Sequence, residues 1–451
     1  MGKTNAKKHK AKRKTKKKNK VGYKWLLTVA IFLVVIGVVA GALFWLLPKV
    51  TKTGGVRVGL PQLELQLAKG MTFNDFKRGD KTTKYYDNSL TVTDANGKVQ
   101  YNEVVLKGRG NTTWRRAKRP MQIKLAQKTP FLGMEKAKKW VLLANYLDAS
   151  QLRNDTAMYV SRMLDFSPTL GGEFAELSIN GDYQGLYYIT HHVEIGKGAV
   201  DLRNEKGILV EIDNLHKSEL NCYTSDEGMC LAVKDAVSED MAAESMEDFL
   251  KDFNALESAV KKRDFKKIES LIDVESFAKY FLLSEFTVNP DAYTSSWFMY
   301  KDGPNDKIHA GPGWDFDLAL GNREWAWQMT DDFYLPDKDM IREVEAMGGK
   351  VVIDGKTTEK EPDPAISKLM YQLIRIPEFR EKVKSVFNEK MHGNKDKLVN
   401  HIMQQLSDIY PAAMRNEKKW HQGDFKNEVK SLFDWLTKRY NHFEETYGDK
   451  D

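Results

Sequence analysis

Short runs of alternating apolar and polar residues fill the chain from about residue 60 to residue 213, and this period of two predicts β-strands. Asn-Gly pairs at residues 96–97 and 180–181 separate neighbouring runs, and such pairs favour tight hairpin turns. One helix is expected among these strands, over residues 149–164. The clearest strand runs are residues 63–67, 90–93, 100–106, 121–125, 140–143, 174–179, 183–189 and 207–213.

The pattern changes after residue 236, where longer segments follow the helical period. Strands followed by helices predict an α+β fold, with a cleft where the β-rich and helical halves meet. The expected elements are helices at 241–259 and 274–286, a strand pair at 295–300 and 307–310, and helices across 363–447 with breaks near Pro377, Gly393 and Gly423.

A long apolar segment stands near the start of the chain. Residues 25–47 contain no charged side chain, and at about 1.5 Å per residue a helix of this length spans roughly 30 Å, the thickness of a bilayer core. A buried core helix rarely stays apolar on every face for so long. A cleavable signal peptide is a stronger alternative, because Val38 and Ala40 are small, but its apolar region is usually about 7–15 residues. An uncleaved transmembrane anchor is therefore predicted, followed by a stalk over residues 48–60.

The basic residues are concentrated beside this segment. The chain has 70 Lys and Arg against 63 Asp and Glu. Twelve of these bases and no acids fall in residues 1–24, so the remainder has 58 bases against 63 acids. Because basic flanks stay in the cytoplasm, the prediction is a cytoplasmic tail and an extracytoplasmic domain in the cell envelope. Attraction to anionic lipid explains the tail, and nucleic acid is not expected as a partner.

Two cysteines agree with an exported domain. Cys222 and Cys230 are separated by eight positions in a polar segment rich in turn-forming residues. This spacing suits a disulfide that closes a loop, and exported compartments permit such bonds. Two isolated cysteines do not supply a closed zinc site. A disulfide is the preferred interpretation.

Three clusters contain residues suited to chemistry. A glycine turn with Arg109 is followed by a strand that carries Lys124, and both cations can neutralise phosphate; an ordinary hairpin is the alternative. Asp315 and Asp317 flank a phenylalanine in an apolar segment, where they can bind Mg²⁺ or act as loop caps and ion-pairing acids. Asp291 starts a loop after Asn-Pro, which is also consistent with simple turn chemistry.

The order of these clusters follows that of a protein-kinase site: a glycine turn, a strand lysine, a loop aspartate and an aspartate before phenylalanine. The sequence resembles the spore-coat CotH-type family of atypical kinases over roughly residues 60–325. The matching segments are residues 107–114, 118–120, 122–125, 140–145 with Asp148, 152–154, 179–187, 211–213, Asp291 and 314–317.

The resemblance implies a membrane-anchored bacterial kinase with a divergent, two-lobed kinase-like fold, an N-lobe at about 61–236 and a C-lobe at about 237–451. Such an enzyme would transfer the γ-phosphoryl group of ATP to serine or threonine of an envelope protein, with Mg²⁺ or Mn²⁺ as cofactor. By similarity, Asp291 orients or deprotonates the acceptor hydroxyl. The other implied roles are metal binding for Asp315, Asp317 and Ser296, phosphate contacts for Arg109, Asn111 and Lys124, and further nucleotide contacts for Arg153 and Glu211.

Some features depart from the usual kinase pattern. The GxGxxG, His-Arg-Asp and Asp-Phe-Gly signatures are absent, and Ser295 and Ser296 stand where an asparagine usually serves the second metal ion. ATP is also scarce outside the cytoplasmic membrane. The alternatives are a non-catalytic, pseudokinase-like surface protein that binds envelope or wall components, and a transferase that acts on a wall glycan or glycolipid.

Overall fold

The structure is a computed structural model that describes residues 59–214, 220–322, 330, 350–353, 356–359 and 368–449. The described elements belong to one compact unit, Leu60–Asp451. The predicted basic tail (1–24), transmembrane helix (25–47) and all but the last two residues of the predicted stalk (48–60) lie outside these residues. No helix in the described part of the chain is both long and apolar enough to span a bilayer.

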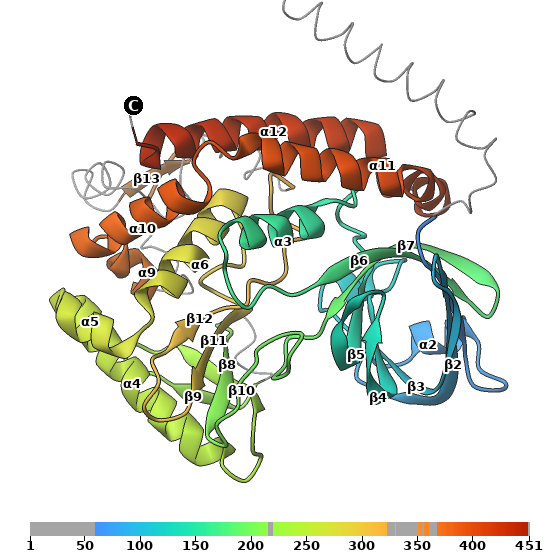
Figure 1. Ribbon diagram of the computed structural model, residues 1–451, viewed down its shortest axis with the longest axis horizontal. Helices are drawn as coiled ribbons and strands as arrows, with labels where there is room; N and C mark the ends of the chain where they lie inside the picture. Colours follow the sequence, from blue (N-terminus) through green and yellow to red (C-terminus); the bar gives the residue numbers. More distant parts are fainter. Residues whose placement is uncertain are drawn as a thin grey trace, which may run out of the picture. The chain divides into compact units, whose positions relative to one another are not determined.

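The first part of this unit is a closed β-barrel (Figure 1). Its strands follow the order β1-β2-β3-β4-β5-β7-β6, and a parallel pairing of β1 with β6 closes it. Alternation along the strands places one set of apolar side chains inside, such as Leu106, Ile123 and Trp140. The strands are β1 (Gln62–Gln66), β2 (Tyr85–Asp94), β3 (Gly97–Gly108), β4 (Met121–Phe131), β5 (Met134–Leu143), β6 (Gly172–Ile179) and β7 (Asp182–His191).

A second sheet follows the barrel, with the order β12-β11-β8-β10-β9. Cys222 and Cys230 form a disulfide across the β9–β10 hairpin, which confirms the prediction from their spacing. Strands β8 and β11 pair across the predicted lobe boundary at residue 236, so this boundary runs through the second sheet. The strands are β8 (Gly207–Ile212), β9 (Cys222–Thr224), β10 (Cys230–Ala236), β11 (Trp297–Asp302) and β12 (His309–Ala310).

Helices cover this second sheet and share its hydrophobic core, which is separate from the barrel core. Helix α6 is the central one, with almost every side chain buried. Figure 1 shows α11 and α12 side by side, with one end of α11 beside the barrel near β7. The helices are α2 (Phe73–Arg78), α3 (Arg153–Met163), α4 (Ala242–Lys262), α5 (Phe265–Leu271), α6 (Val274–Thr287), α9 (Lys368–Leu373), α10 (Pro377–Lys390), α11 (Lys395–Trp420) and α12 (Phe425–Tyr447). A short 3-10 helix, η1 (Thr113–Arg115), and a two-stranded sheet of β13 (Lys350–Ile353) and β14 (Lys356–Glu359) complete the described elements.

Polar contacts fasten α11 to the barrel. The guanidinium of Arg415 donates two hydrogen bonds to Glu176 on β6, at 2.6 and 3.0 Å. The indole of Trp420 donates to the carbonyl of Gln184 on β7 at 2.8 Å. Both contacts join elements more than 200 residues apart in the chain. Helix α11 therefore fixes the barrel against the second core.

Candidate active site

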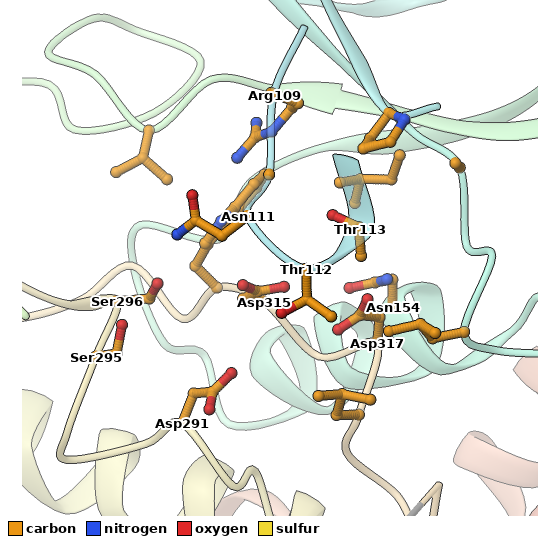
Figure 2. Close-up of a pocket in the computed structure, with 18 of the residues that line it drawn as sticks. Arg109, Asn111, Thr112, Thr113, Asn154, Asp291, Ser295, Ser296, Asp315 and Asp317 are labelled. Carbon is orange, nitrogen blue, oxygen red and sulfur yellow. The ribbon is translucent and has the colours of Figure 1, made fainter. Parts of the chain in front are cut away.

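A cavity of about 420 Å³ lies between the barrel and the second core. Figure 2 shows Asp315 and Asp317 beneath the turn that carries Asn111 and Thr112, with Asp291 farther from the turn, below them. This volume falls in the range of small-molecule sites. Three parts of the lining are named here for later use: the β3–β4 turn (residues 109–120), the acidic loops (residues 289–296 and 314–320), and the sheet wall (Glu211, Asp213, Lys234 and Phe298). Residues 143–147, Asn154, His192 and Val193 complete the lining.

The β3–β4 turn is held tightly against its own side chains. A Cβ atom on Gly108 would lie 2.5 Å from the ring of Trp114, so a larger residue does not fit without displacing the indole. Gly110 has a φ of +77°, which favours glycine. The guanidinium of Arg109 lies 5.1 Å from the centre of the Trp314 ring. The turn thus presents a cation to the cavity in a defined place.

The acidic loops have an irregular backbone. Tyr293, Ser296, Asp315 and Leu320 all have positive φ values between 52° and 66°, a conformation that is uncommon for residues with side chains. Such residues persist where surrounding contacts hold them and are often found at functional sites. One such contact is the hydrogen bond from the Leu320 amide to the carbonyl of Thr287 at 2.7 Å.

Asparagine side chains hold the loop that carries Asp315 and Asp317. The buried Asn154, in the first turn of α3, accepts a hydrogen bond from the amide of Phe316 at 3.2 Å. Asn289 donates to the carbonyl of Trp314 at 3.4 Å. Asn154 also lines the cavity, although the sequence had not singled it out as a site residue. Asn154 belongs to the segment 152–154 that resembles the CotH-type family, and this resemblance was the signal that could have identified it.

The two acidic loops influence each other through charge. Burial raises the pKa of Asp315 to about 6, and repulsion from Asp291 adds to the increase. The Arg109 guanidinium acts in the opposite direction. Burial also lowers the pKa of Arg109, while Asp315 and Glu211 partly restore it. The cavity therefore holds crowded carboxylates, which a cationic ligand would stabilise. They face the half-buried guanidinium of Arg109, which an anionic ligand would stabilise.

The sheet wall adds a second cation. Lys234 on β10 forms an ion pair with Glu211 on β8, with 2.7 Å between Nζ and Oε2. Its ammonium group also lies 5.1 Å from the centre of the Phe298 ring. Glu211 was expected from the sequence, whereas Lys234 was missed. A lysine near the end of a short strand has no local feature that separates it from a surface lysine.

Comparison with known families gives the chain an assignment. The family described as "CotH kinase protein" matches residues 106–443, which is about three quarters of the chain. The chain belongs to the CotH kinase family. The α+β class and the family that the sequence predicted are both confirmed.

The other comparisons add little to this assignment. No curated protein matches this CotH kinase chain. A search of solved structures gives a match titled "Crystal structure of the golgi casein kinase", with 9% sequence identity and a TM-score of 0.21. It covers 87% of this chain and 76% of that chain. A TM-score this low carries no argument about fold or function.

Most residues nominated from the sequence line the cavity of this CotH kinase. They come from four separate parts of the chain, and the fold brings them together. They are Arg109, Asn111, Glu211, Asp291, Ser296, Asp315 and Asp317, and Ser295 lies among them. Asn111 also accepts a hydrogen bond from the ammonium group of Lys81, outside the cavity lining.

Lys124 does not line the cavity, contrary to the prediction. Strand β4 turns Met121, Ile123 and Leu125 into the barrel, so Lys124 between them points outward and is exposed. It lies opposite Val105 on β3 and Lys139 on β5. Because a strand turns successive side chains to opposite faces, a lysine in a strand has an even chance of pointing away from the site.

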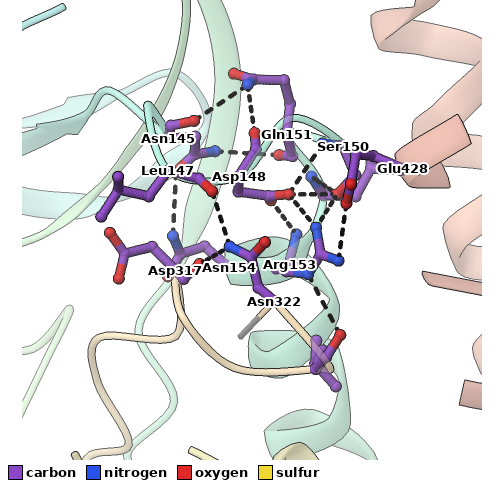
Figure 3. A network of polar contacts seen from close by, with 12 residues as sticks. Asn145, Leu147, Asp148, Ser150, Gln151, Arg153, Asn154, Asp317, Asn322 and Glu428 are labelled. Carbon is purple, nitrogen blue, oxygen red and sulfur yellow. Dashed lines mark hydrogen bonds and ion pairs between the residues drawn. The ribbon is translucent and has the colours of Figure 1, made fainter. Parts of the chain in front are cut away.

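Arg153 also lies outside the cavity lining, where it supports the site from behind (Figure 3). Its side chain is buried and forms an ion pair with Asp148 at 2.6 Å. Its Nε donates to the carbonyl of Leu320 at 3.3 Å, and a further contact reaches Glu428 on α12 at 3.3 Å. Arg153 therefore connects the start of α3 to an acidic loop and to the C-terminal helix.

His192 was not predicted but lines the cavity beside the cations. Burial lowers its pKa to about 2, and Arg109 and Lys234 repel a proton on the ring. The imidazole is therefore neutral at physiological pH. Its Nδ1 is buried and has no hydrogen-bond partner among the described residues.

The donor set fits a divalent metal of the kind a kinase uses. In the described part of the chain, no cluster of three or more His, Cys, Asp or Glu residues is arranged to hold a metal ion. Mg²⁺ in kinase sites, however, is bound through one or two carboxylates together with substrate phosphates. Asp315 and Asp317 supply two carboxylates, and a bound cation would stabilise the ionised form of Asp315, whose pKa is raised by burial and by repulsion from Asp291. These two residues would hold the metal, with the Ser296 hydroxyl as a further candidate.

Proposed function

We propose that the protein transfers the γ-phosphoryl group of ATP to serine or threonine side chains of a protein in the cell envelope. The observation that carries this proposal is the opposed charge of the cavity walls. Arg109 on the β3–β4 turn and Lys234 on the sheet wall supply cations, whereas Asp291, Asp315 and Asp317 on the acidic loops supply carboxylates. Phosphoryl transfer requires positioning and charge neutralisation more than covalent chemistry, and these walls supply both.

Each wall has a separate task in this proposal. Arg109, held over Trp314, binds phosphate oxygens and brings the polyphosphate toward the acids. Asp315 and Asp317 hold a divalent metal, which when bound neutralises phosphate charge. Asp291 accepts a hydrogen bond from the acceptor hydroxyl and orients it. As the hydroxyl oxygen attacks the γ-phosphorus, the bond to the β,γ-bridging oxygen breaks, ADP leaves and Asp291 takes the hydroxyl proton. The raised pKa of Asp315 predicts that metal binding weakens as the pH falls through about 6.

Placement in the envelope is part of the proposal. Residues 25–47 would form a single transmembrane helix, with the basic tail in the cytoplasm and the kinase domain outside. The disulfide between Cys222 and Cys230 supports an oxidising location. Protease added to intact cells should cut the domain as readily as it does in lysed cells. Protection in intact cells would show that the orientation is wrong.

The catalytic proposal is tested with the full chain, radiolabelled ATP, Mg²⁺ or Mn²⁺, and envelope proteins as acceptors. We expect the wild-type protein to label serine or threonine and Asp315→Ala to lose this labelling. Asp182→Ala is the matched control, because Asp182 is an exposed acid at a hairpin of the barrel. Equal labelling by wild type and Asp315→Ala would refute the proposal. Nucleotide binding without transfer to any acceptor would favour the non-catalytic alternative.

A further inference from the structure

Lys118 is a buried lysine within the β3–β4 turn. Its side chain is fully buried, with 0% exposure. The ammonium group donates a hydrogen bond to the carbonyl of Ala144 at 2.7 Å and another to the carbonyl of Leu186. It also lies 4.6 Å from the centre of the Tyr187 ring. No acidic side chain in the described part of the chain forms an ion pair with it, so two carbonyls and a ring are its partners.

Stability alone gives little reason for a lysine here. Burying an amine without a carboxylate partner is costly, and burial lowers the pKa of Lys118 well below its ordinary value. An apolar side chain of similar volume would often serve a core position at least as well. Buried ionisable groups that the core does not require tend to occur near functional sites.

The two carbonyls that Lys118 binds belong to different parts of the fold. Ala144 follows β5, and it lines the cavity together with Asn145. Leu186 lies on β7, and its amide donates to Asn416 of α11 at 3.2 Å. Lys118 therefore joins three segments: the β3–β4 turn, the start of the loop that leads to α3, and strand β7, which is hydrogen-bonded to α11.

Neighbouring contacts fasten the same end of the turn. The hydroxyl of Tyr187 donates to the carbonyl of Arg119 at 3.0 Å. The guanidinium of Arg119 lies 4.9 Å from the centre of the Trp114 ring, the ring that would clash with a Cβ on Gly108. Lys118 and Tyr187 thus anchor the end of the turn that leads into β4. The Trp114 ring packs against Gly108 at the end of the turn that follows β3.

We propose that Lys118 is a positioning residue that sets the β3–β4 turn, and with it Arg109, at the place where phosphate is bound. The proposal rests on the proposed nucleotide site. Lys118 does not line the cavity. It acts through the backbone of the turn and through its hydrogen bond to the carbonyl of Ala144. This bond fixes the distance between the turn and the loop that carries Asn145.

The test uses full-length Lys118→Met, which keeps the length of the side chain and removes the donors. Lys118→Arg keeps donors and charge, and Lys128→Met is the matched control, because Lys128 is an exposed residue of β4. Two measurements are made on each protein: hydrogen exchange of the amides of residues 109–117, and the affinity for a fluorescent ATP analogue. Lys118→Met should speed exchange and weaken binding by about tenfold each. Lys118→Arg should recover part of both effects, and Lys128→Met should change neither.

Tyr187→Phe provides a milder version of the same test. It removes the hydrogen bond to Arg119 and keeps the ring beneath the amine, so about a threefold effect on both measurements is expected. If Lys118→Met changes the melting temperature but neither measurement, the proposal is overturned, because the lysine then only fills the core. If Lys118→Met does not fold, unchanged exchange and affinity in Tyr187→Phe overturn it.

The two proposals fail in different ways. If the wild-type protein binds no nucleotide, while exchange in the turn still responds to Lys118→Met, the proposed function is wrong and Lys118 is confirmed as the residue that sets the turn. If the wild-type protein binds nucleotide and Lys118→Met binds it equally well, the proposed function stands and the role given to Lys118 is wrong.

Discussion

The two sides of the cavity are built from different kinds of backbone. The β3–β4 turn projects from a closed barrel of regular strands with its own hydrophobic core. The acidic loops belong to the second core and contain left-handed residues such as Ser296 and Asp315. The cationic side is therefore short and local, since Arg109 directly follows β3. The acidic side depends on contacts that come from distant parts of the chain.

This difference shows where positional accuracy comes from on each side. In the turn, two glycines and Trp114 set the near end of the backbone within a few residues, and the proposed role of Lys118 is confined to the far end. In the acidic loops, Asn154 binds the amide of Phe316, and Arg153 binds the carbonyl of Leu320. A sheltered loop with strained residues keeps its shape only while such contacts remain. Substitutions behind the acidic loops should therefore cost more than substitutions on the barrel surface.

The largest effect is expected from Arg153→Met. It leaves Asp148 as a buried carboxylate without its partner, which should lower the free energy of unfolding by about 3–5 kcal/mol. Urea denaturation measures this loss. Arg203→Met is the control, because its ion pair with Asp201 is 78% and 42% exposed, and little change is expected there. If both variants lose a similar free energy of unfolding, the buried ion pair between Arg153 and Asp148 does not support the acidic loops.

Arg109→Gln tests the cationic side. Removing a half-buried guanidinium from a phosphate site should weaken nucleotide binding by about 100-fold, because a charge-assisted hydrogen bond to phosphate is lost and water replaces it only poorly. Isothermal titration with ATP measures the affinity. Arg116→Gln is matched to it, since Arg116 is an exposed residue of the same turn and does not line the cavity. Equal affinities of the two variants would show that the nucleotide does not contact this side.

Asp315→Asn should stabilise the folded protein while removing a metal ligand. The folded-state pKa of about 6 lies above the ordinary value of 3.8, so the ionised carboxylate destabilises the fold at pH values above 6. The substitution should therefore raise the free energy of unfolding at pH 7.5 by about 2 kcal/mol. The gain should fade as the pH falls from 6 toward 4, where the wild-type carboxyl becomes protonated.

Denaturation at pH 7.5 and at pH 4 measures both parts of this prediction. Asp182→Asn serves as the control, because Asp182 is exposed and away from the cavity. A loss of stability in Asp315→Asn at pH 7.5 would contradict the picture of crowded carboxylates. Stability gained at the expense of function is a common property of active-site substitutions.

The strands of the barrel could be predicted because their signal is local. Alternation over residues 121–125 and 183–189 marks parts of β4 and β7. The closure of the barrel could not be predicted, because the pairing of β1 with β6 joins segments more than 100 residues apart. The same holds for the pairing of β8 with β11, which crosses the expected lobe boundary.

The residues of the site were predicted only in part, because local motifs can be read from the sequence and long-range packing cannot. Motifs with several matching residues, such as the turn with Arg109 and the loop with Asp315, were correctly placed at the cavity. Lys234 and His192 were missed, since each stands near the end of a strand with no motif around it. Their role depends on which strands become neighbours, and that is decided by tertiary packing.

The smallest effect is expected from Lys124→Ala, compared with Lys234→Met. Lys124 is exposed on the outer face of β4 and does not line the cavity, and its neighbour Lys139 on β5 forms an ion pair with Glu194. Nucleotide affinity should therefore stay within about twofold of wild type. Lys234 lines the cavity beside Glu211, and its loss should weaken binding by about tenfold. Titration with ATP compares the two. A larger effect at Lys124 would mean that phosphate is bound on the outer face of the barrel, and that its regular strands contribute to the site as directly as the turn does.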